Sequence, residues 1–342
     1  MRKKTIILLA IISMLGCNDR NNHSQSKGHS KSVQEKTFVV LGGEEQYVEM
    51  TGASDELPVL LFLHGGPGWP QTPYLRYFNG DLTKEMILVS WDQAGCGLSY
   101  LNNPNPKNLS IESLISDAHE LTLYLKKKFK KRKIFLMGFS YGSVLGLQLA
   151  EKYPEDYHAY IGVSQLIDSE KNWDISLQWL NEQAQAKNDT AALKKLALIK
   201  QKDSSVCKTV LDCSMNRYWL LVKFNGTIFK PELAKEIEKA EHYYDEYKDY
   251  DWFEVYNYTC SRLGDKRFHT DLTSIHLLDV PVFMLAGRHD WNLPGIVAQQ
   301  YLEGLKAPDK KFIWFEKSGH EPPEEEAELF NKTIIEIVKD KS

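Results

Sequence analysis

The stretch that decides the fold is Lys133–Ala150, KIFLMGFSYGSVLGLQLA. Its first part is a continuous apolar run, typical of a strand buried on both faces of a sheet, and its last part carries apolar residues at a helical period. Between them, GFSYG at residues 138–142 fits the pattern G-x-S-x-G, in which a serine occupies a sharp turn from strand to helix. Glycines are favoured beside Ser140 because strand and helix approach too closely there for a β-carbon.

Other stretches repeat this succession of strand and helix. Apolar runs end in glycine-rich turns at PVLLFLHGGPG (residues 58–68) and MILVSWDQAG (86–95), and again at VPVFMLAGRHD (280–290) and KKFIWFEKSGH (310–320). Residues 111–128 have a roughly helical period. Strands that alternate with helices form βαβ units with parallel strands. We therefore expect an α/β fold class, with a mostly parallel sheet flanked by helices.

Residues 165–275 interrupt this succession. They are rich in Trp, Tyr, Lys and Glu at helical spacing, and they contain no convincing buried strand. We expect a helical cap at residues 165–275, inserted into a core made of residues 36–164 and 276–342. The end of the chain, residues 322–341, is typical of one closing helix that begins with proline and carries acidic residues in its first turn.

The N-terminus has the features of an export signal. Three basic residues precede an apolar stretch that is shorter than the roughly 20 residues a membrane-spanning helix needs, so we interpret residues 1–16 as a signal peptide. The sequence SMLGC is similar to the cleavage box of bacterial lipoproteins, and predicts that Cys17 is lipidated and anchors the protein to a membrane of the bacterial cell envelope. An ordinary secretory signal is the alternative. The polar residues 17–35 suit a flexible tether.

Composition excludes some functions. The 342 residues carry a net charge of −4 and 42% hydrophobic residues, which does not favour nucleic-acid binding. The chain has no C-x-x-C or H-E-x-x-H motif and its histidines are scattered, so we expect no metal site. An exported protein can form disulfides, but the sequence does not decide how the remaining cysteines pair. They are Cys96, Cys207, Cys213 and Cys260.

A nucleophilic serine needs a base, and the base needs an acid that orients it. In this architecture the order along the chain is serine, acid, histidine. Asp290 and His320 follow the last two expected strands in that order, after glycine-bearing turns, and are our candidates. His289 is a rival for the base, although it shares its loop with the expected acid. This chemistry requires no cofactor.

Acyl transfer also needs hydrogen-bond donors for the developing oxyanion. We expect one donor to be the backbone N–H of Tyr141, the residue after the nucleophile. The other should come from the glycine turn after an earlier strand, with Gly66 as the first candidate and Gly65 as the second. A tight bend that requires positive φ would explain the same glycines, and is compatible with this role.

Five motifs of the sequence together resemble those of a known superfamily. The motifs LHGGPG, WDQAGCGLS, GFSYGS, GRHDWNLP and SGHEPP occur in the order and approximate spacing of the α/β-hydrolase superfamily, and HGGPG with DQxGxGxS is most similar to its proline iminopeptidase branch. The resemblance covers residues 38–164 and the chain from residue 280 onward. It implies the α/β-hydrolase fold, a helical cap that shapes the pocket, and three roles: nucleophile Ser140, acid Asp290 and base His320.

The sequence departs from this branch at two places. Ala94 stands where the family motif DQRG has arginine, so a supporting contact of that loop is missing. The family's aminopeptidases hold the free amine of the substrate with cap glutamates in a Trp-Glu setting, for which residues 165–274 contain no convincing match. The acidic and aromatic residues 241–258 are a substitute that could bind an ammonium group, with Glu254 as the best single candidate. A cap helix with a solvated acidic face explains that stretch equally well.

We interpret the mature protein as a serine hydrolase that forms an acyl-enzyme. The resemblance implies an aminopeptidase that removes N-terminal residues, proline among them, from small peptides. The missing cap signature favours an alternative, an esterase or amidase of small acyl compounds. A non-catalytic binding protein on a hydrolase scaffold is the alternative from another class, because a fold does not fix a function.

Overall fold

The computed structural model describes residues 30–342, except for the side chain of Arg267. The expected signal peptide, Cys17 and most of the expected tether lie outside the described residues. Residues 31–342 form one compact unit. The first strand, β1, begins at Val33, so the last residues of the segment expected as a tether, 33–35, belong to the sheet instead. Their partners in β2 extend to Gly52, which explains why this polar stretch is ordered.

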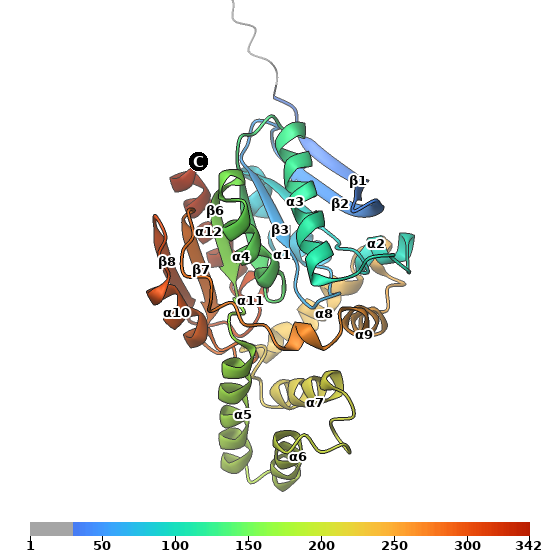
Figure 1. The fold of residues 1–342 in the computed structure, drawn as a ribbon, viewed down its shortest axis with the longest axis vertical. Helices are drawn as coiled ribbons and strands as arrows, with labels where there is room; N and C mark the ends of the chain where they lie inside the picture. Colours follow the sequence, from blue (N-terminus) through green and yellow to red (C-terminus); the bar gives the residue numbers. More distant parts are fainter. Residues whose placement is uncertain (1–29) are drawn as a thin grey trace, which may run out of the picture. The chain divides into compact units, whose positions relative to one another are not determined.

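An eight-stranded sheet organises this unit, with the strand order β1-β2-β4-β3-β5-β6-β7-β8 (Figure 1). The pairs β1–β2 and β2–β4 are antiparallel, and all pairs from β4–β3 to β7–β8 are parallel. The expectation of a mostly parallel sheet flanked by helices is therefore confirmed. The strands are β1 (Val33–Leu41), β2 (Glu44–Gly52), β3 (Val59–Leu63), β4 (Ile87–Trp91), β5 (Ile134–Phe139), β6 (Tyr157–Val163), β7 (Val282–Gly287) and β8 (Lys310–Phe315).

Helices cover both faces of the sheet because its central strands are apolar on both sides. In β3, Leu61 and Leu63 belong to one buried cluster with helices α3, α4 and α10, whereas Leu60 and Phe62 belong to a second cluster with α1 and α12. Figure 1 shows α3 and α4 in front of the sheet. These core helices are α1 (Thr72–Phe78), α2 (Gly97–Asn102), α3 (Ile111–Lys128), α4 (Gly142–Lys152), α10 (Gly295–Gly304), α11 (Pro322–Glu325) and α12 (Ala327–Lys341).

The C-terminal stretch differs from the expected single helix. It forms the short α11 and then α12, because Glu326 between them has an extended φ of −128°. The acidic residues Glu324 and Glu325 are buried rather than solvated, with 4% and 3% of their surface exposed. Each accepts hydrogen bonds from other parts of the chain, which is how a buried carboxylate is retained in a fold.

The cap, residues 164–281 between β6 and β7, is helical. Figure 1 shows α5, α6 and α7 as a separate group at the lower end of the molecule, with α8 and α9 nearer to the sheet. The group of three has its own buried cluster, and a disulfide joins Cys207, in the connection between α6 and α7, to Cys213 in the first turn of α7. The cap helices are α5 (Ser169–Ala186), α6 (Thr190–Lys200), α7 (Val210–Lys223), α8 (Ala234–His242) and α9 (Trp252–Leu263).

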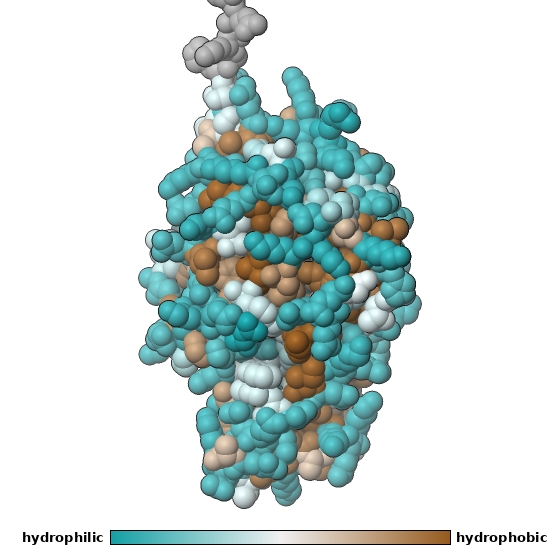
Figure 2. Space-filling model, turned by 90° about the vertical axis from the view of Figure 1, so that its left-hand side faces the viewer, coloured by the Kyte–Doolittle hydropathy of each residue, from teal (hydrophilic) through white to brown (hydrophobic). Residues whose placement is uncertain are grey.

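On the face drawn in Figure 2, hydrophilic side chains predominate and apolar ones gather in a middle band above the cap helices at the lower end. Within residues 30–342, the helices are too short or too polar for any of them to cross a membrane.

Candidate active site

The turn between β5 and α4 places Ser140 at the edge of the sheet. Ser140 has a φ of +50°, a backbone conformation that serine rarely adopts. A β-carbon on Gly138 would lie 2.6 Å from the carbonyl oxygen of Gly142, and one on Gly142 would lie 2.5 Å from the carbonyl oxygen of His64. Both distances are too short for real contacts, so the two glycines are what allows the serine to stand on this turn.

The structure brings together Ser140, Asp290 and His320. The Nε2 atom of His320 lies 3.0 Å from Ser140 Oγ, and its Nδ1 atom lies 2.7 Å from Asp290 Oδ2. The other oxygen of Asp290 accepts hydrogen bonds from the backbone N–H groups of Asn292 and Leu293, both at 2.8 Å. These donors hold the carboxylate in place, and the carboxylate in turn orients the imidazole toward the serine.

The rival histidine has a different environment. The ring of His289 stacks on that of Phe229, with 3.7 Å between the ring centroids. His289 precedes Asp290 in the loop after β7, but His320, in the loop after β8, is the histidine that contacts the serine. The two loops meet because β7 and β8 are parallel neighbours, so their carboxyl ends lie at the same edge of the sheet.

The charge of His320 depends on its carboxylate neighbours. Burial lowers the pKa of its imidazole, but the negative charges of Asp290, Glu321 and Glu325 outweigh this effect and raise the pKa to about 9. Two of these carboxylates, Glu321 and Glu325, come from residues that closely follow His320 along the chain. The arrangement therefore favours the imidazolium form of His320.

The glycine turn after β3 lies against the serine. A β-carbon on Gly65 would be 2.9 Å from the β-carbon of Ser140, and Gly66 has a φ of +104°. His64 fixes this turn: its Nε2 accepts the backbone N–H of Gln93 at 3.1 Å, which leaves Nδ1 to donate to the carbonyl oxygen of Gly65 at 2.9 Å. Burial lowers the pKa of His64 to about 4, consistent with a neutral ring. The opposite side of the Gly65–Gly66 peptide carries the N–H of Gly66, which has no hydrogen-bond partner within residues 30–342.

A cavity of about 590 Å³ opens over these groups, between the core and the cap. Ser140, Tyr141, Gly66 and His320 line it, and so do three carboxylate side chains, Glu238, Glu241 and Glu321. Much of the remaining wall is aromatic, with Trp69, Tyr74, Phe139, Trp219, Phe253 and Tyr256 among its residues. The cavity therefore combines a nucleophile, negative charge and a largely aromatic surface.

The residue proposed from the sequence for an ammonium group, Glu254, is not among the residues that line the cavity. It lies in the first turn of α9, where its side chain is exposed, whereas its neighbours Val255 and Tyr256 face the protein interior and the cavity. The carboxylates that do line the cavity come from α8 and from the residue after His320. Glu241 is the first residue of the acidic and aromatic stretch 241–258 singled out from the sequence, so that stretch does contribute a carboxylate to the cavity, although not the one named. Glu238 gave no signal, because apolar and charged residues alternate in α8 as on any amphipathic helix.

The family of the chain follows from comparison with known proteins. The family described as alpha/beta hydrolase fold matches residues 58–327. The chain belongs to this family of enzymes. The hydrolase is 28% identical over 308 residues to the probable aminopeptidase YbaC of Bacillus subtilis (strain 168), which covers 89% of this chain and 96% of that protein. It is 26% identical over 299 residues to a proline iminopeptidase of Heyndrickxia coagulans, which covers 86% of this chain and 95% of that protein.

Solved structures agree on the fold. The proline iminopeptidase of Mycobacterium smegmatis superposes on the hydrolase with a TM-score of 0.64 at 16% identity, over 90% of this chain and 98% of the other. A proline iminopeptidase-related protein of Thermus thermophilus does so with a TM-score of 0.63 at 20% identity, over 90% and 98% of the two chains.

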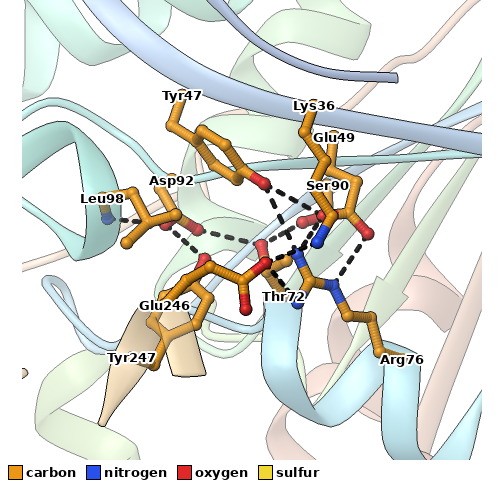
Figure 3. A network of polar contacts seen from close by, with 10 residues as sticks. All are labelled: Lys36, Tyr47, Glu49, Thr72, Arg76, Ser90, Asp92, Leu98, Glu246 and Tyr247. Atoms are coloured by element: carbon orange, nitrogen blue, oxygen red, sulfur yellow. Dashed lines mark hydrogen bonds and ion pairs between the residues drawn. The ribbon is translucent and has the colours of Figure 1, made fainter. Parts of the chain in front are cut away.

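A polar network joins the cap of the hydrolase to the core (Figure 3). Asp92, which follows β4, accepts hydrogen bonds from Thr72 Oγ1 at 2.9 Å, from the hydroxyl of Tyr247 at 2.7 Å and from the N–H of Leu98 at 2.8 Å. Two residues after Asp92 lies Ala94, the position at which the resemblance led us to expect that the contact of an arginine is missing. Burial raises the pKa of Asp92 to about 6, although its hydrogen bonds oppose this shift.

In the same network, Arg76 of α1 forms ion pairs with Glu49 of β2 and with Glu246 of the cap (Figure 3). Glu246 also pairs with Lys36 of β1. Tyr247, the neighbour of Glu246, is the residue that donates to Asp92. The cap is thereby attached to three different elements of the core at this point.

On the other side of the cavity, residues 226–230 of the cap contact the loops of Asp290 and His320. The carbonyl oxygen of Gly226 accepts the N–H of Trp291 at 2.9 Å, and that of Thr227 accepts the N–H of His320 at 2.6 Å. The carboxylate of Glu325 bridges the two parts: one oxygen accepts the N–H groups of Phe229 and Lys230, and the other accepts that of Gly319, the residue before His320.

Arg217 of α7 also reaches the loop of the acid. It donates to Ser176 Oγ at 2.7 Å and to Asn292 Oδ1 at 2.9 Å, and 8% of its surface is exposed. Burial lowers its pKa, to about 10. Within the described part of the chain, no cluster of three or more His, Cys, Asp or Glu side chains is suited to hold a metal ion.

Proposed function

We propose that the hydrolase is a serine aminopeptidase that releases N-terminal residues from small peptides through an acyl-enzyme. The observation that carries this proposal is the position of His320 between Ser140 and Asp290, at 3.0 Å and 2.7 Å, on the wall of a cavity that also holds carboxylates. Nucleophile and base within hydrogen-bond reach, with the base held by a third group, is the arrangement that activates a serine.

In this mechanism the hydroxyl of Ser140 attacks the carbonyl carbon of the scissile bond while His320 Nε2 takes its proton. Asp290 holds the tautomer of the ring and stabilises the imidazolium. The oxyanion is stabilised by the backbone N–H groups of Gly66 and Tyr141, each worth about 2.7–4 kcal/mol of barrier. The imidazolium then protonates the leaving amine. Water, activated by the same histidine, hydrolyses the ester to Ser140 and releases the N-terminal amino acid.

The charge of the cavity supports an aminopeptidase over an esterase. Glu238, Glu241 and Glu321 line it, and a peptide's N-terminus is an ammonium group that such a surface attracts. Glu241 is held by the hydroxyl of Tyr74 at 2.6 Å, which itself accepts the indole N–H of Trp69 at 2.9 Å, so this carboxylate lies among aromatic rings. Aromatic faces and carboxylates together bind ammonium groups well. Relatives named aminopeptidase and proline iminopeptidase support the same substrate class.

The test compares alanyl and prolyl anilides with phenyl esters of short acyl chains. We expect turnover of the aminoacyl substrates by the wild type, and loss of both turnover and fluorophosphonate labelling in Ser140→Ala. Ser274→Ala, at an exposed position outside the cavity, is a matched control that removes a serine hydroxyl elsewhere and should keep the labelling. Turnover confined to the esters would replace the aminopeptidase proposal by an esterase, and undiminished turnover by Ser140→Ala would refute the serine mechanism.

Export and anchoring are a separate proposal, which the sequence motif ending at Cys17 supports. We propose that the lipid on Cys17 tethers the enzyme to a membrane of the bacterial envelope. Metabolic labelling with a fatty acid should mark the wild type but not Cys17→Ser. Equal labelling of both would refute this proposal without bearing on the catalytic one.

A further inference from the structure

Among the three carboxylates of the cavity, Glu321 has a distinct environment. The carboxylate of Glu241 is bonded to Tyr74, and Glu238 is exposed at the rim. The side chain of Glu321 has neither a hydrogen bond nor an ion pair within residues 30–342, although it lines the cavity and directly follows His320. A partly buried carboxylate without a partner is costly, and such a group commonly serves a ligand.

The groups around Glu321 do not compensate its charge. Asp290 from the loop after β7, Glu324 and Glu325 from α11, and Glu241 from α8 all add negative charge near it. The hydroxyls of Tyr74 of α1 and Tyr218 of α7 are also within electrostatic range.

Among the described side chains that line the cavity, those that can be cationic are Arg217 and His320. The guanidinium of Arg217 is already bonded to Ser176 and Asn292. Of these two groups, His320 is the one whose positive charge lowers the pKa of Glu321.

The mutual electrostatic influence of Glu321 and His320 has a consequence for catalysis. Burial, together with the negative charges of Glu325, Asp290 and Glu241, raises the pKa of Glu321 to about 7, although the positive charge on His320 opposes this shift. In return, the negative charge on Glu321 helps to raise the pKa of His320. A protonated imidazole cannot take the proton of Ser140. An ammonium group that binds at Glu321 would cancel the charge that favours the imidazolium, and would release His320 to act as a base.

We propose that Glu321 transmits the charge of the substrate's ammonium group to His320, so that the base is fully active only when an aminoacyl substrate is bound. Glu321 is then a specificity-determining residue supplied by the core rather than the cap. This inference rests on the aminopeptidase function proposed above, and it adds that the free amine contributes to the rate of the chemical step as well as to binding.

The experiment measures pH profiles with two substrates that differ by the amine alone, alanine 4-nitroanilide and propionyl 4-nitroanilide. The acidic limb of kcat/KM reports the base in the free enzyme, and that of kcat reports the base in the complex. For the wild type we expect the kcat limb to lie at lower pH than the kcat/KM limb with the alanine substrate, and the two limbs to coincide with the propionyl substrate.

The variant Glu321→Gln removes the charge and keeps the shape. We expect its acidic limbs to coincide for both substrates, at lower pH than the kcat/KM limb of the wild type. Its preference for the free amine, measured as the ratio of kcat/KM values, should fall by about tenfold or more. Glu254→Gln, at an exposed position of α9 that does not line the cavity, is the matched control and should retain both the separation of the limbs and the preference.

The outcomes separate this inference from the function on which it rests. A wild type that prefers the alanine substrate but has coincident limbs overturns the inference and leaves the aminopeptidase function intact. The same conclusion follows if Glu321→Gln is labelled by the fluorophosphonate but keeps the full wild-type preference for the alanine substrate. A wild type without preference for the amine overturns both. If Glu321→Gln does not fold, the comparison of the acidic limbs of kcat and kcat/KM in the wild type still tests the inference.

Discussion

The backbone N–H of His320 donates a hydrogen bond to the carbonyl oxygen of Thr227, with 2.6 Å between nitrogen and oxygen. Thr227 lies in the cap, between α7 and α8, whereas His320 ends the loop after β8 in the core. The cap of this hydrolase therefore does more than cover the cavity, because it helps to position the proposed base.

Glu325 makes this relationship testable. The variant Glu325→Ala leaves the N–H groups of Gly319, Phe229 and Lys230 without their acceptor. We expect the free energy of unfolding to fall by about 2–4 kcal/mol, and kcat to fall as the loop of His320 loosens. Chemical denaturation and steady-state kinetics measure both. Glu328→Ala, an exposed acidic residue of α12, should change neither, and wild-type values for Glu325→Ala would show that the bridge is dispensable.

The turn of the nucleophile should not tolerate a single methyl group. In Gly142→Ala the new β-carbon would lie 2.5 Å from the carbonyl oxygen of His64, which is backbone and cannot move aside. We expect a loss of more than about 3 kcal/mol in the free energy of unfolding and loss of fluorophosphonate labelling. Gly304→Ala, where no atom lies within 4 Å of the new β-carbon, is the control. Normal labelling of Gly142→Ala would contradict the close approach of α4 to β3.

Arg217 should act on the rate through the loop of the acid. Its guanidinium bonds the side chain of Asn292, whose backbone N–H bonds Asp290. In Arg217→Met the apolar stem is kept and these donors are lost, so we expect kcat to fall by about tenfold with a smaller change in KM. Arg288→Met removes an exposed arginine from the same loop, one that pairs with Glu316, and should have little effect. An unchanged kcat for Arg217→Met would limit this arginine to a structural role.

Asp92 should make stability depend on pH in an unusual direction. Burial raises its pKa to about 6, above the roughly 3.9 of an unfolded chain, so the folded state binds the proton more tightly. Its contribution to the free energy of unfolding should therefore become more favourable as pH falls from about 7 to about 4, by up to about 3 kcal/mol. The measurement is the difference between wild type and Asp92→Asn across this range. A difference that is constant with pH would show that Asp92 stays ionised.

The sequence was sufficient to predict the core and the principal residues of the candidate site. Strands of a parallel sheet are continuous apolar runs, and the glycine turns at their ends are legible, so Ser140, Asp290 and His320 could be named and the structure brings them together. The acidic residues could not be assigned in this way. Glu321 and Glu325 resemble solvated residues at the start of a helix, and only the approach of residues 226–230, about 95 positions earlier in the chain, shows that Glu325 is buried.

The cap is fastened to the core on two sides of the cavity, at Asp92 and Arg76 and again at residues 226–230. Trp219 and Phe253, which line the cavity and are 47% and 45% exposed, lie with their ring centroids 5.7 Å apart. If the proposed aminopeptidase function holds, a cap attached in this way would restrict the cavity to substrates that fit between cap and core. A short, flexible peptide can thread its first residue into such a cavity, whereas a terminus packed against a folded domain is excluded, which would protect intact neighbouring proteins from trimming.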